Sequence, residues 1–482
     1  MIKNKLAKIP LGVKSAVVYT TASVFSKGLS VITVPIFTRL MSTEQIGIVN
    51  LFNSWVSMLV VFVNLSLTSG GYSVALQEYS DKRDEYQSSI LTLTTIMALI
   101  LLGTYAIFPN QWHDLTGLSF PLLTLMFVGF IFTPAQEFWL LRQRFEYKYK
   151  LAGLLTMGTA LVTSIISVIV VINMSSEYPN RLAEGRLFST QIISYSVAAI
   201  IWGYILLRGH KFINLHYWKY SLKISIPLIG YAFALQVLNV SDRTMISRMV
   251  GNSEVGIYST LYTVSSLSLL VWSAINSAFI PYLFQNIENR DNKIKTISTS
   301  LMGAYAAIAV LLTFFAPEIV RILATEEYYE AIYIMPPIAG GVFLTSVSNM
   351  YSNVLVYYKR TKYIMYAAVV AAILNVVLNY FGIRAFGYMA AAYTTLIAYV
   401  VMSIMLAHYA NKIRFKMTEK GNTVYDDRKV LLMSVASIAI CLSCLVWYYN
   451  TTVRYVLICV LAFAAIYIGK KTFKTLKQKW EK

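Results

Sequence analysis

Charged residues are scarce in this chain. They make up 13% of its 482 residues, about half the share found in soluble domains. Hydrophobic residues account for 57%, the mean hydropathy is +0.59, and apolar runs of about 18 residues or more recur to the end of the sequence. This pattern excludes a soluble globular protein. We expect no cleavable signal peptide, because the apolar stretch that begins at Ser15 is too long and lacks a small-residue cleavage site.

Residues that support catalysis or metal binding are also few. The three cysteines, Cys441, Cys444 and Cys459, lie in apolar runs, and the C-x-x-C pair has no second Cys or His pair beside it. We expect all three to be packing residues. No loop contains a His/Asp/Glu cluster, a nucleotide motif or a metal-ligand set. The sequence therefore predicts neither an enzyme nor a protein with a bound metal or cofactor.

The apolar runs predict an all-α, polytopic membrane protein with about fourteen transmembrane helices. The predicted spans are 15–38, 46–69, 88–108, 118–140, 151–172, 189–207, 224–246, 255–284, 297–316, 334–358, 363–382, 386–410, 430–449 and 453–469. The last of these is marginal in length, so twelve or thirteen spans remain open.

The distribution of Lys and Arg orients these spans. With the N-terminus inside, most of the 41 basic residues fall on one side of the membrane, as the positive-inside rule requires of the cytoplasm. The basic residues left on the other side are Arg39, Arg181, Arg186, Arg248, Arg321, Arg384 and Arg454. Both termini are therefore predicted to be cytoplasmic. The net charge of +19 then follows from topology, and no nucleic-acid partner is expected.

The first and second halves of the chain resemble each other. Arg39-Leu-Met-Ser-Thr-Glu-Gln-Ile-Gly-Ile-Val-Asn aligns with Arg248-Met-Val-Gly-Asn-Ser-Glu-Val-Gly-Ile-Tyr-Ser, Phe108-Pro109 with Ala316-Pro317, and Lys148-Tyr149 with Lys362-Tyr363. The order of these landmarks predicts two parallel six-helix halves around a central cavity. The predicted parts are 1–207, a cytoplasmic linker 208–223, 224–410, and an accessory helix pair with a basic tail, 411–482. Chance matching of short apolar patterns is the alternative.

Charged residues inside predicted spans mark candidate functional positions. Lys27 lies in the middle of 15–38, and Asp242 and Arg243 lie in 224–246. An ammonium at mid-membrane costs at least about 2.5–3.5 kcal/mol, so it persists mainly where it faces a polar cavity or a partner. The sequence therefore predicts a charged interior.

Four segments carry a further pattern: Val34-Pro-Ile-Phe-Thr-Arg-Leu, Ser241-Asp-Arg-Thr-Met-Ile-Ser-Arg, Phe315-Ala-Pro-Glu-Ile-Val-Arg-Ile-Leu and Gly382-Ile-Arg-Ala-Phe-Gly-Tyr. With the length and span number, they resemble the prokaryotic polysaccharide transporter family, the oligosaccharide flippases of the MATE-like superfamily. The resemblance implies movement of an undecaprenyl-pyrophosphate-linked oligosaccharide from the inner to the outer leaflet of the bacterial cytoplasmic membrane. The product would serve surface polysaccharide assembly, such as O-antigen or capsule.

Such a substrate carries a pyrophosphate, which gives the intramembrane cations a role. Lys27 and Arg243 are predicted to form a cationic cavity for the phosphate or an acidic glycan, with Gln236 as the repeat counterpart of Lys27. The alternatives are a snorkelling or hydrogen-bonded Lys27, and a gate or interhelix ion pair at Asp242 and Arg243. Arg39 and Arg248 are expected to hold the repeated turn.

Two carboxylates and several amides complete the candidate site. Glu137 and Asp242 are candidates for coupling to Na⁺ or H⁺ or for a gate, although Glu137 can instead be an interfacial partner of Arg142. The candidate cavity amides are Asn239, Asn276, Asn349, Asn353, Asn375 and Asn379. Hydrogen bonding between helices is their commoner use.

Two other functions stay open. An ion-coupled multidrug antiporter of the same superfamily usually has twelve spans and binds cationic drugs at carboxylates. The charges inside the spans of this chain instead favour an anionic substrate, modestly, because they include Lys27 and Arg243. A membrane polysaccharide polymerase needs catalytic groups that the short outer loops lack. The expected partners are the lipid-linked oligosaccharide, membrane lipids and a polysaccharide polymerase of the same pathway, and the expected state is a monomer.

Overall fold

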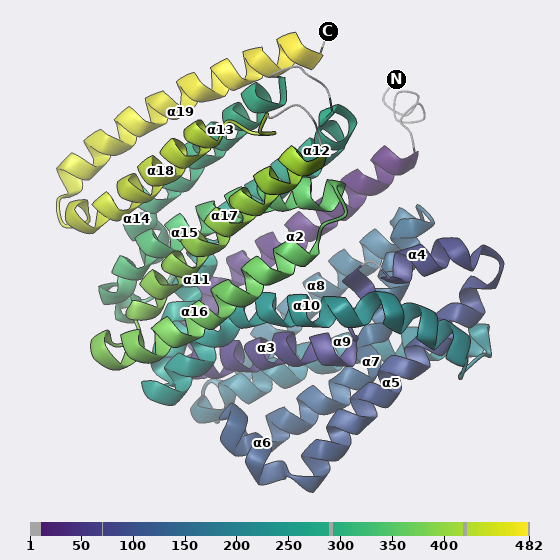
Figure 1. Ribbon diagram of the computed structural model, residues 1–482. Helices are drawn as coiled ribbons and strands as arrows, with labels where there is room; N and C mark the ends of the chain where they lie inside the picture. Colours follow the sequence, from purple (N-terminus) through teal and green to yellow (C-terminus); the bar gives the residue numbers. More distant parts are fainter. Residues whose placement is uncertain (1–10, 70, 289–292, 418–421, 481–482) are drawn as a thin grey trace, which may run out of the picture. The chain divides into compact units, whose positions relative to one another are not determined.

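The computed structural model describes residues 11–69, 71–288, 293–417 and 422–480, and these residues contain helices but no strand (Figure 1). The earlier helices are α2 (Leu11–Leu40), α3 (Thr43–Val63), η1 (Leu67–Ser69), α4 (Gly71–Glu78), η2 (Ser80–Lys82), α5 (Arg83–Ile107), α6 (Pro109–Thr116), α7 (Phe120–Phe145), α8 (Tyr149–Met174), η3 (Pro179–Arg181), α9 (Leu182–Gly209) and α10 (Leu215–Met249). The later ones are α11 (Asn252–Ser265), α12 (Ser268–Asn286), α13 (Lys293–Phe314), α14 (Ala316–Leu323), η4 (Glu326–Tyr328), η5 (Glu330–Ile334), α15 (Met335–Tyr357), α16 (Lys362–Phe386), α17 (Ala390–Met417), α18 (Asp427–Trp447) and α19 (Thr451–Trp480).

Eleven of the described helices are long and apolar enough to cross a membrane. Two more candidate spans are bent pairs: the segments of α10 meet at 49°, and α11 meets α12 at 42°. One shorter apolar helix, Thr451–Tyr467, covers the last predicted span. The structure therefore confirms an all-α, polytopic membrane protein, with up to thirteen spans and this shorter helix.

The described residues form two compact units, residues 1–256 and 257–482. Their boundary does not coincide with the predicted halves, because α10 packs against α3, α4 and α5 in the first unit. The division into 1–207, 208–223, 224–410 and 411–482 was based on sequence repetition, and it stays a prediction.

Local structure around the three repeat landmarks is alike. Phe108-Pro109 and Ala316-Pro317 each begin a helix of eight residues, α6 and α14, with proline in the first turn. The helices α7 and α15 then end in the same way, with Tyr147 (φ 55°) and Lys359 (φ 56°) in the left-handed region. Backbone amides of the next residues reach back to the last turn in both caps, Lys148 to Gln143 and Arg360 to Leu355, each at 2.8 Å. These matched caps support the predicted repeat.

The repeated glycine motif brings two backbones together. Gly47 near the start of α3 and Gly256 in α11 occupy matching places in the two motifs. A Cβ on Gly47 would lie 1.7 Å from the carbonyl oxygen of Asn252, and one on Gly256 would lie 2.0 Å from that of Thr43. Glycine is needed here because no side chain fits between the two helices.

The predicted linker is partly helical. Residues 210–214 are non-helical, and α10 begins at Leu215, within the stretch predicted to connect the halves. Its first turns are hydrogen-bonded to α5: Trp218 Nε1 donates to the Ser89 carbonyl at 2.9 Å, and the hydroxyls of Tyr86 and Ser221 are 2.8 Å apart. Such anchoring fits a segment at the membrane interface that is bound to protein on one side.

The C-x-x-C pair is buried as expected of packing residues. Cys441 and Cys444 pack with Val310, Phe314 and Ile458 in a core formed by α13, α15, α18 and α19. The described residues contain no group of three or more His, Cys, Asp or Glu side chains that could hold a metal ion.

Candidate functional site

Lys27 lies on the least covered of the eleven spans. Only 6% of the most apolar stretch of α2 is buried, because α2 packs mainly on α8. The Lys27 side chain is exposed and has no ion-pair partner among the described residues, and a Cβ on the adjacent Gly28 would meet no atom within 4 Å. The position is therefore open, and the lysine does not take part in an interhelix ion pair with another described residue.

The candidate residues of α10 differ in their surroundings. Asp242 is fully buried and Arg243 is half-buried, as expected of neighbours that point about 100° apart on a helix. Arg243 donates to the Asn239 carbonyl at 2.7 Å. Gln236 is half-buried, about one turn before Asn239 and two turns before Arg243, and no described contact joins it to Lys27. The structure thus brings Asn239 and Arg243 together but not Lys27 and Gln236.

Glu137 lies inside the protein, against the turn that ends α3. The Nδ2 atom of Asn64 donates to Glu137 Oε2 at 2.7 Å, and Asn64 is 5% exposed. The next two residues, Leu65 (φ 49°) and Ser66 (φ 50°), are both in the left-handed region, which is uncommon for residues other than glycine. Strained backbone of this kind is tolerated where the surroundings fix it, often at functional sites. Here it places an amide on an intramembrane carboxylate.

Buried hydroxyls without a described hydrogen-bond partner lie on the chain segments that pack near Asn64 and Glu137. The hydroxyls of Ser66, Tyr72 and Thr133 are buried and have no hydrogen-bond partner among the described residues, and Thr133 lies one turn before Glu137 on α7. Tyr72 stacks on Phe138, with ring centroids 4.8 Å apart. A carboxylate with one neutral donor is costly when ionised at this depth, and a proton or a monovalent cation would stabilise it. The carboxylate, amide and hydroxyl oxygens are hard donors that suit such a cation.

The sequence did not predict this partner of Glu137. Arg142, one of the two alternatives, instead contacts Asp84, Gln87 and Glu146. The only sequence signal was Asn64 itself, a polar residue at the end of an apolar run.

The predicted cavity amides of α16 are enclosed. Asn375 and Asn379 are fully buried, the Nδ2 atom of Asn379 donates to Asn375 Oδ1 at 3.2 Å, and the Nδ2 atom of Asn375 donates to Thr395 on α17 at 3.1 Å. Thr394 donates to Asn379. These contacts match the alternative use of asparagine, hydrogen bonding between helices. Asn353 likewise donates to Asn276, at 2.9 Å.

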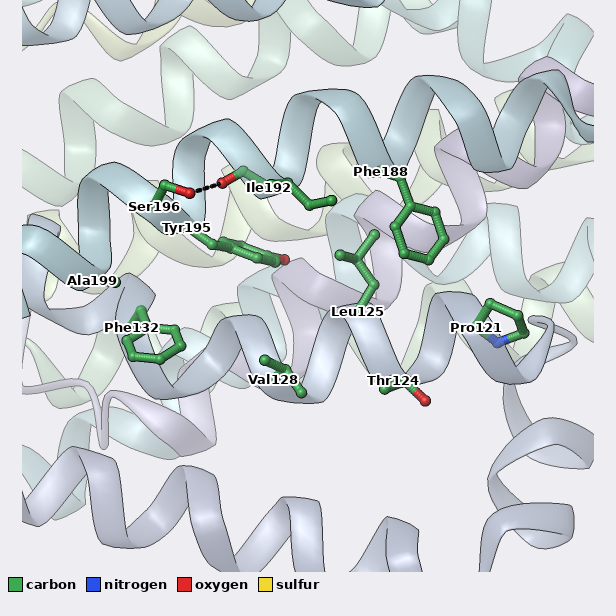
Figure 2. Close-up of a pocket in the computed structure, with 10 residues that line it drawn as sticks. All are labelled: Pro121, Thr124, Leu125, Val128, Phe132, Phe188, Ile192, Tyr195, Ser196 and Ala199. Carbon is green, nitrogen blue, oxygen red and sulfur yellow. Dashed lines mark hydrogen bonds between the residues drawn. The ribbon is translucent and has the colours of Figure 1, made fainter. Parts of the chain in front are cut away.

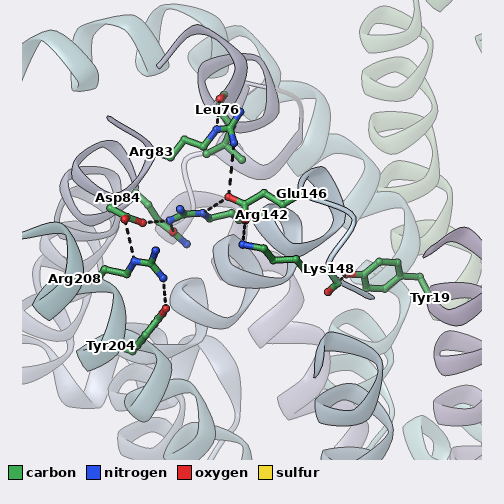
Figure 3. Close-up of polar contacts among 10 residues, drawn as sticks. Tyr19, Leu76, Arg83, Asp84, Arg142, Glu146, Lys148, Tyr204 and Arg208 are labelled. Atoms are coloured by element: carbon green, nitrogen blue, oxygen red, sulfur yellow. Dashed lines mark hydrogen bonds and ion pairs between the residues drawn. The ribbon is translucent and has the colours of Figure 1, made fainter. Parts of the chain in front are cut away.

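A network of charged residues ties together the ends of three helices in the first unit (Figure 3). Asp84 at the start of α5 accepts from Arg142 of α7 and from Arg208 of α9, the latter at 2.9 Å. Arg142 Nε also donates to Glu146 at 2.8 Å, and Lys148 Nζ lies 2.6 Å from the other carboxylate oxygen. We call these five residues the Asp84 cluster. By the predicted topology, it lies at the cytoplasmic end.

The cluster is electrostatically asymmetric. Burial works against ionisation of Glu146, but hydrogen bonds from Lys148 and Arg142 outweigh it and hold the Glu146 pKa below its ordinary value of 4.5. The three cations of the cluster, together with Arg83 at 3.9 Å from Glu146, surround its two carboxylates, so the site keeps a positive excess. Sequence reasoning missed the cluster because its members are far apart along the chain.

Comparison with known proteins identifies the family. The sequence profile described as polysaccharide biosynthesis protein matches residues 13–287, more than half of the chain, and the MatE profile matches residues 227–381. The probable low-salt glycan biosynthesis flippase Agl15 of Haloferax volcanii is 22% identical over 85% of this chain and 86% of its own length.

Solved structures show the same fold. The lipid II flippase MurJ in an inward closed conformation has a TM-score of 0.64 at 15% identity, covering 97% of this chain and 100% of its own. An inward-facing multidrug resistance MATE transporter has a TM-score of 0.60 at 14% identity, covering 82% and 96%. The chain therefore belongs to the polysaccharide biosynthesis protein family, within the MATE-like superfamily predicted from its motifs.

Proposed function

We propose that the protein is a flippase that moves an undecaprenyl-pyrophosphate-linked oligosaccharide from the inner to the outer leaflet of the cytoplasmic membrane. The observation that carries this proposal is the family match over residues 13–287, and the relatives named as glycan and lipid II flippases support it. A role in surface polysaccharide assembly, with both termini cytoplasmic, follows from the same proposal. Transport without covalent chemistry agrees with those relatives.

The open position of Lys27 supports a role in holding the cargo. Its exposed ammonium lies on a helix with little protein cover, which suits contact with a phosphate or an acidic glycan inside the membrane. Arg243, on the first helix of the second predicted half, is the second cation of this proposed cavity. We assign Gln236 and Asn239 to the polar lining, since neither is fully buried, and Asn375 and Asn379 to support of the α16–α17 interface.

In a transporter that works by alternating access, the cavity closes at one side of the membrane when it opens at the other. The contact of Gly47 with the Asn252 backbone is a suitable outer closure in the predicted topology. The hydroxyls of Thr43 and Ser253 are 2.6 Å apart beside it. A disulfide between Thr43→Cys and Ser253→Cys is therefore expected to stop transport, with activity returning after reduction.

Coupling to an ion gradient is proposed at Glu137, with Asp242 as a second candidate. Replacement of Glu137 by Gln keeps the shape and a partner for Asn64 but removes the charge. We expect this variant to transport without dependence on a proton or Na⁺ gradient. An unchanged gradient dependence in both Glu137→Gln and Asp242→Asn would contradict ion coupling at these residues.

The central test is transport in vesicles that contain the purified protein and a fluorescent lipid-linked oligosaccharide. Flipping exposes the glycan to an added lectin or glycosidase on the other face. Lys27→Ala should lower the rate about tenfold, the loss that corresponds to one charged hydrogen bond, whereas Lys27→Arg should retain most of it. The exposed Lys211→Ala, outside the spans, is the matched control. An unchanged rate in Lys27→Ala, at equal protein levels, would remove Lys27 from the cavity.

A multidrug antiporter is the second candidate, because the MatE profile matches residues 227–381 and two carboxylates lie within spans. The same vesicles distinguish the two. Efflux of a cationic dye that depends on Asp242 or Glu137, without movement of the lipid-linked sugar, would favour the antiporter.

A further inference from the structure

Two apolar grooves lie on the membrane-spanning helices, one in each unit, and they use matching faces. The helices α9 and α17 both have 28 residues. In α9 the groove lining includes Ile192, Tyr195, Ser196 and Ala199, and in α17 it includes Val400, Ser403, Ile404 and Ala407, at the same positions counted from each helix start. The cavity volumes are about 480 Å³ and 370 Å³. The two grooves therefore use matching positions of α9 and α17, the last helices of the two predicted halves.

The groove of the first unit is a two-walled surface. Figure 2 shows the side chains of α7 and α9 facing each other along it, and the lining contains no charged residue. The Tyr195 ring fits there because a Cβ on Gly129 of α7 would come within 2.1 Å of it. Such a surface suits lipid chains of any kind.

The groove of the second unit has a third wall and a polar end. The helix α18 packs on α15 and adds apolar residues to the side of the groove opposite α17. Ile404, Leu431 and Val435 are each about 60% exposed along it, so the groove opens to the lipid. At one end, His408, Asn411 and Asp427 join the lining. An apolar channel with a polar end fits an amphiphile whose chain lies in the membrane.

The polar end carries a carboxylate, Asp427, that forms no ion pair with a described residue. Asp427 accepts from the Tyr351 hydroxyl at 2.6 Å and from Asn411 Nδ2 at 2.7 Å, both neutral donors. No described cation forms an ion pair with Asp427, whereas the adjacent Asp426 is paired with Lys429 at 2.8 Å. The carboxylate is therefore held in place by protein groups and is available to one more donor, preferably a cation.

We propose that the α15–α17–α18 groove binds a phospholipid with a primary-amine head group, its acyl chain along the apolar walls and its ammonium at Asp427. The charge excludes an anionic head group at this position, because like charges repel where water is scarce. The exposed Arg428, next to Asp427, is placed to meet the lipid phosphate. The basic residues of this region belong to the predicted cytoplasmic side, so the lipid comes from the inner leaflet. This site does not depend on which cargo the protein moves.

The test is native mass spectrometry of the full-length protein, released from vesicles of phosphatidylethanolamine and phosphatidylglycerol in equal amounts. The wild type is expected to retain the amine lipid over the anionic one by roughly tenfold, the ratio expected of one charged hydrogen bond. Asp427→Asn keeps the groove and the contact with Tyr351 in shape, so it should retain lipid but lose the preference.

A matched pair of variants tests the groove itself. Ala407→Trp fills the groove of the second unit and should abolish preferential retention, whereas Ala199→Trp, at the same position of α9, should leave it intact. Equal melting temperatures in the two variants show that both are folded. The proposal is overturned if Asp427→Asn keeps the wild-type preference, if the two tryptophan variants behave alike, or if the wild type retains both lipids equally.

Discussion

The two units have helix ends with the same backbone conformation, at Tyr147 and Lys359, but different charged side chains hold those ends together. In the first unit, Asp84 receives two arginines, and one of them, Arg142, also holds Glu146. In the second unit, Glu288 accepts from Arg414 at 3.2 Å and from the hydroxyl of Tyr358 at 2.9 Å, its two hydrogen bonds to described side chains. Both clusters tie together the residues at the ends of equivalent helices, α7 with α9 and α15 with α17.

The difference lies in where the charge is buried. Both arginines are largely buried, but Glu146 beside Arg142 is 11% exposed, whereas Glu288 beside Arg414 is about half exposed, so water can hydrate Glu288 when its contact is lost. A buried ion that loses its partner is costly, and an exposed one is not. The first unit therefore depends on its cluster more than the second does.

The largest expected effect comes from the contact that the repeated motifs share. Gly47→Ala places a methyl group 1.7 Å from a backbone oxygen, which only separation of α3 and α11 relieves. We expect the free energy of unfolding to fall by roughly 3 kcal/mol and transport to stop. Gly103→Ala, where a Cβ meets nothing within 4 Å, is the control and should be neutral or slightly stabilising. Thermal unfolding in detergent measures both, and equal melting temperatures would refute the contact.

Next in size is the loss of each central arginine. Arg142→Met removes one charged hydrogen bond each from Asp84 and Glu146, which keep Arg208 and Lys148 as partners, so the free energy of unfolding should fall by roughly 2–3 kcal/mol. Arg414→Met should cost only about 1 kcal/mol, since Glu288 can be hydrated. The exposed Arg144→Met serves as the control on the same helix. A larger loss from Arg414→Met than from Arg142→Met would reverse the comparison.

A smaller effect follows from pH. The Glu146 pKa is lower in the folded protein than its ordinary value of 4.5, so its contribution to stability is present above that value and is lost as the pH falls through the lowered pKa. The melting temperature of the wild type should therefore fall between about pH 5 and 3 more steeply than that of Glu146→Gln. Parallel profiles for the two proteins would show that Glu146 gains nothing from Lys148 and Arg142.

The smallest effect is a gain. Tyr147 and Lys359 adopt the left-handed conformation at matching helix ends, and glycine is preferred there. Tyr147→Gly and Lys359→Gly should each raise the free energy of unfolding by about 0.5–1 kcal/mol. Similar gains at the two sites, measured by thermal unfolding, would support equivalent caps. A gain at one site and a loss at the other would show that the side chains contribute differently.

The sequence predicted the fold because span length and apolar composition are properties of single segments. The repeat landmarks have matching local structure, since Pro109 and Pro317 each lie in the first turn of an eight-residue helix, but the predicted division into two halves stays a prediction. The site was harder to predict. Glu137 was recognised as a carboxylate within a predicted span, but its partner Asn64 is 73 residues away in the sequence. The turn after Asn64 is left-handed at Leu65 and Ser66, and neither residue type predicts that conformation.

Amides were the least predictable group. Asn239 and Asn375 are the same residue type in similar apolar runs, yet one is exposed and the other is enclosed between helices. Hydrophobic periodicity reports which residues avoid water, and in a membrane the lipid-facing and protein-facing sides are equally apolar. The face of a helix that carries a polar residue therefore depends on packing that the sequence does not encode locally.

The Gly47–Gly256 contact has a mechanical consequence. Glycines have no side chains to interlock, so the touching surfaces of α3 and α11 are smooth, and little apolar area is lost when they separate. Such a surface therefore offers little resistance to separation of the two helices. The two helices can therefore separate and return with little repacking, and the hydrogen bond between Thr43 and Ser253 beside the glycines is the side-chain contact that breaks and forms again.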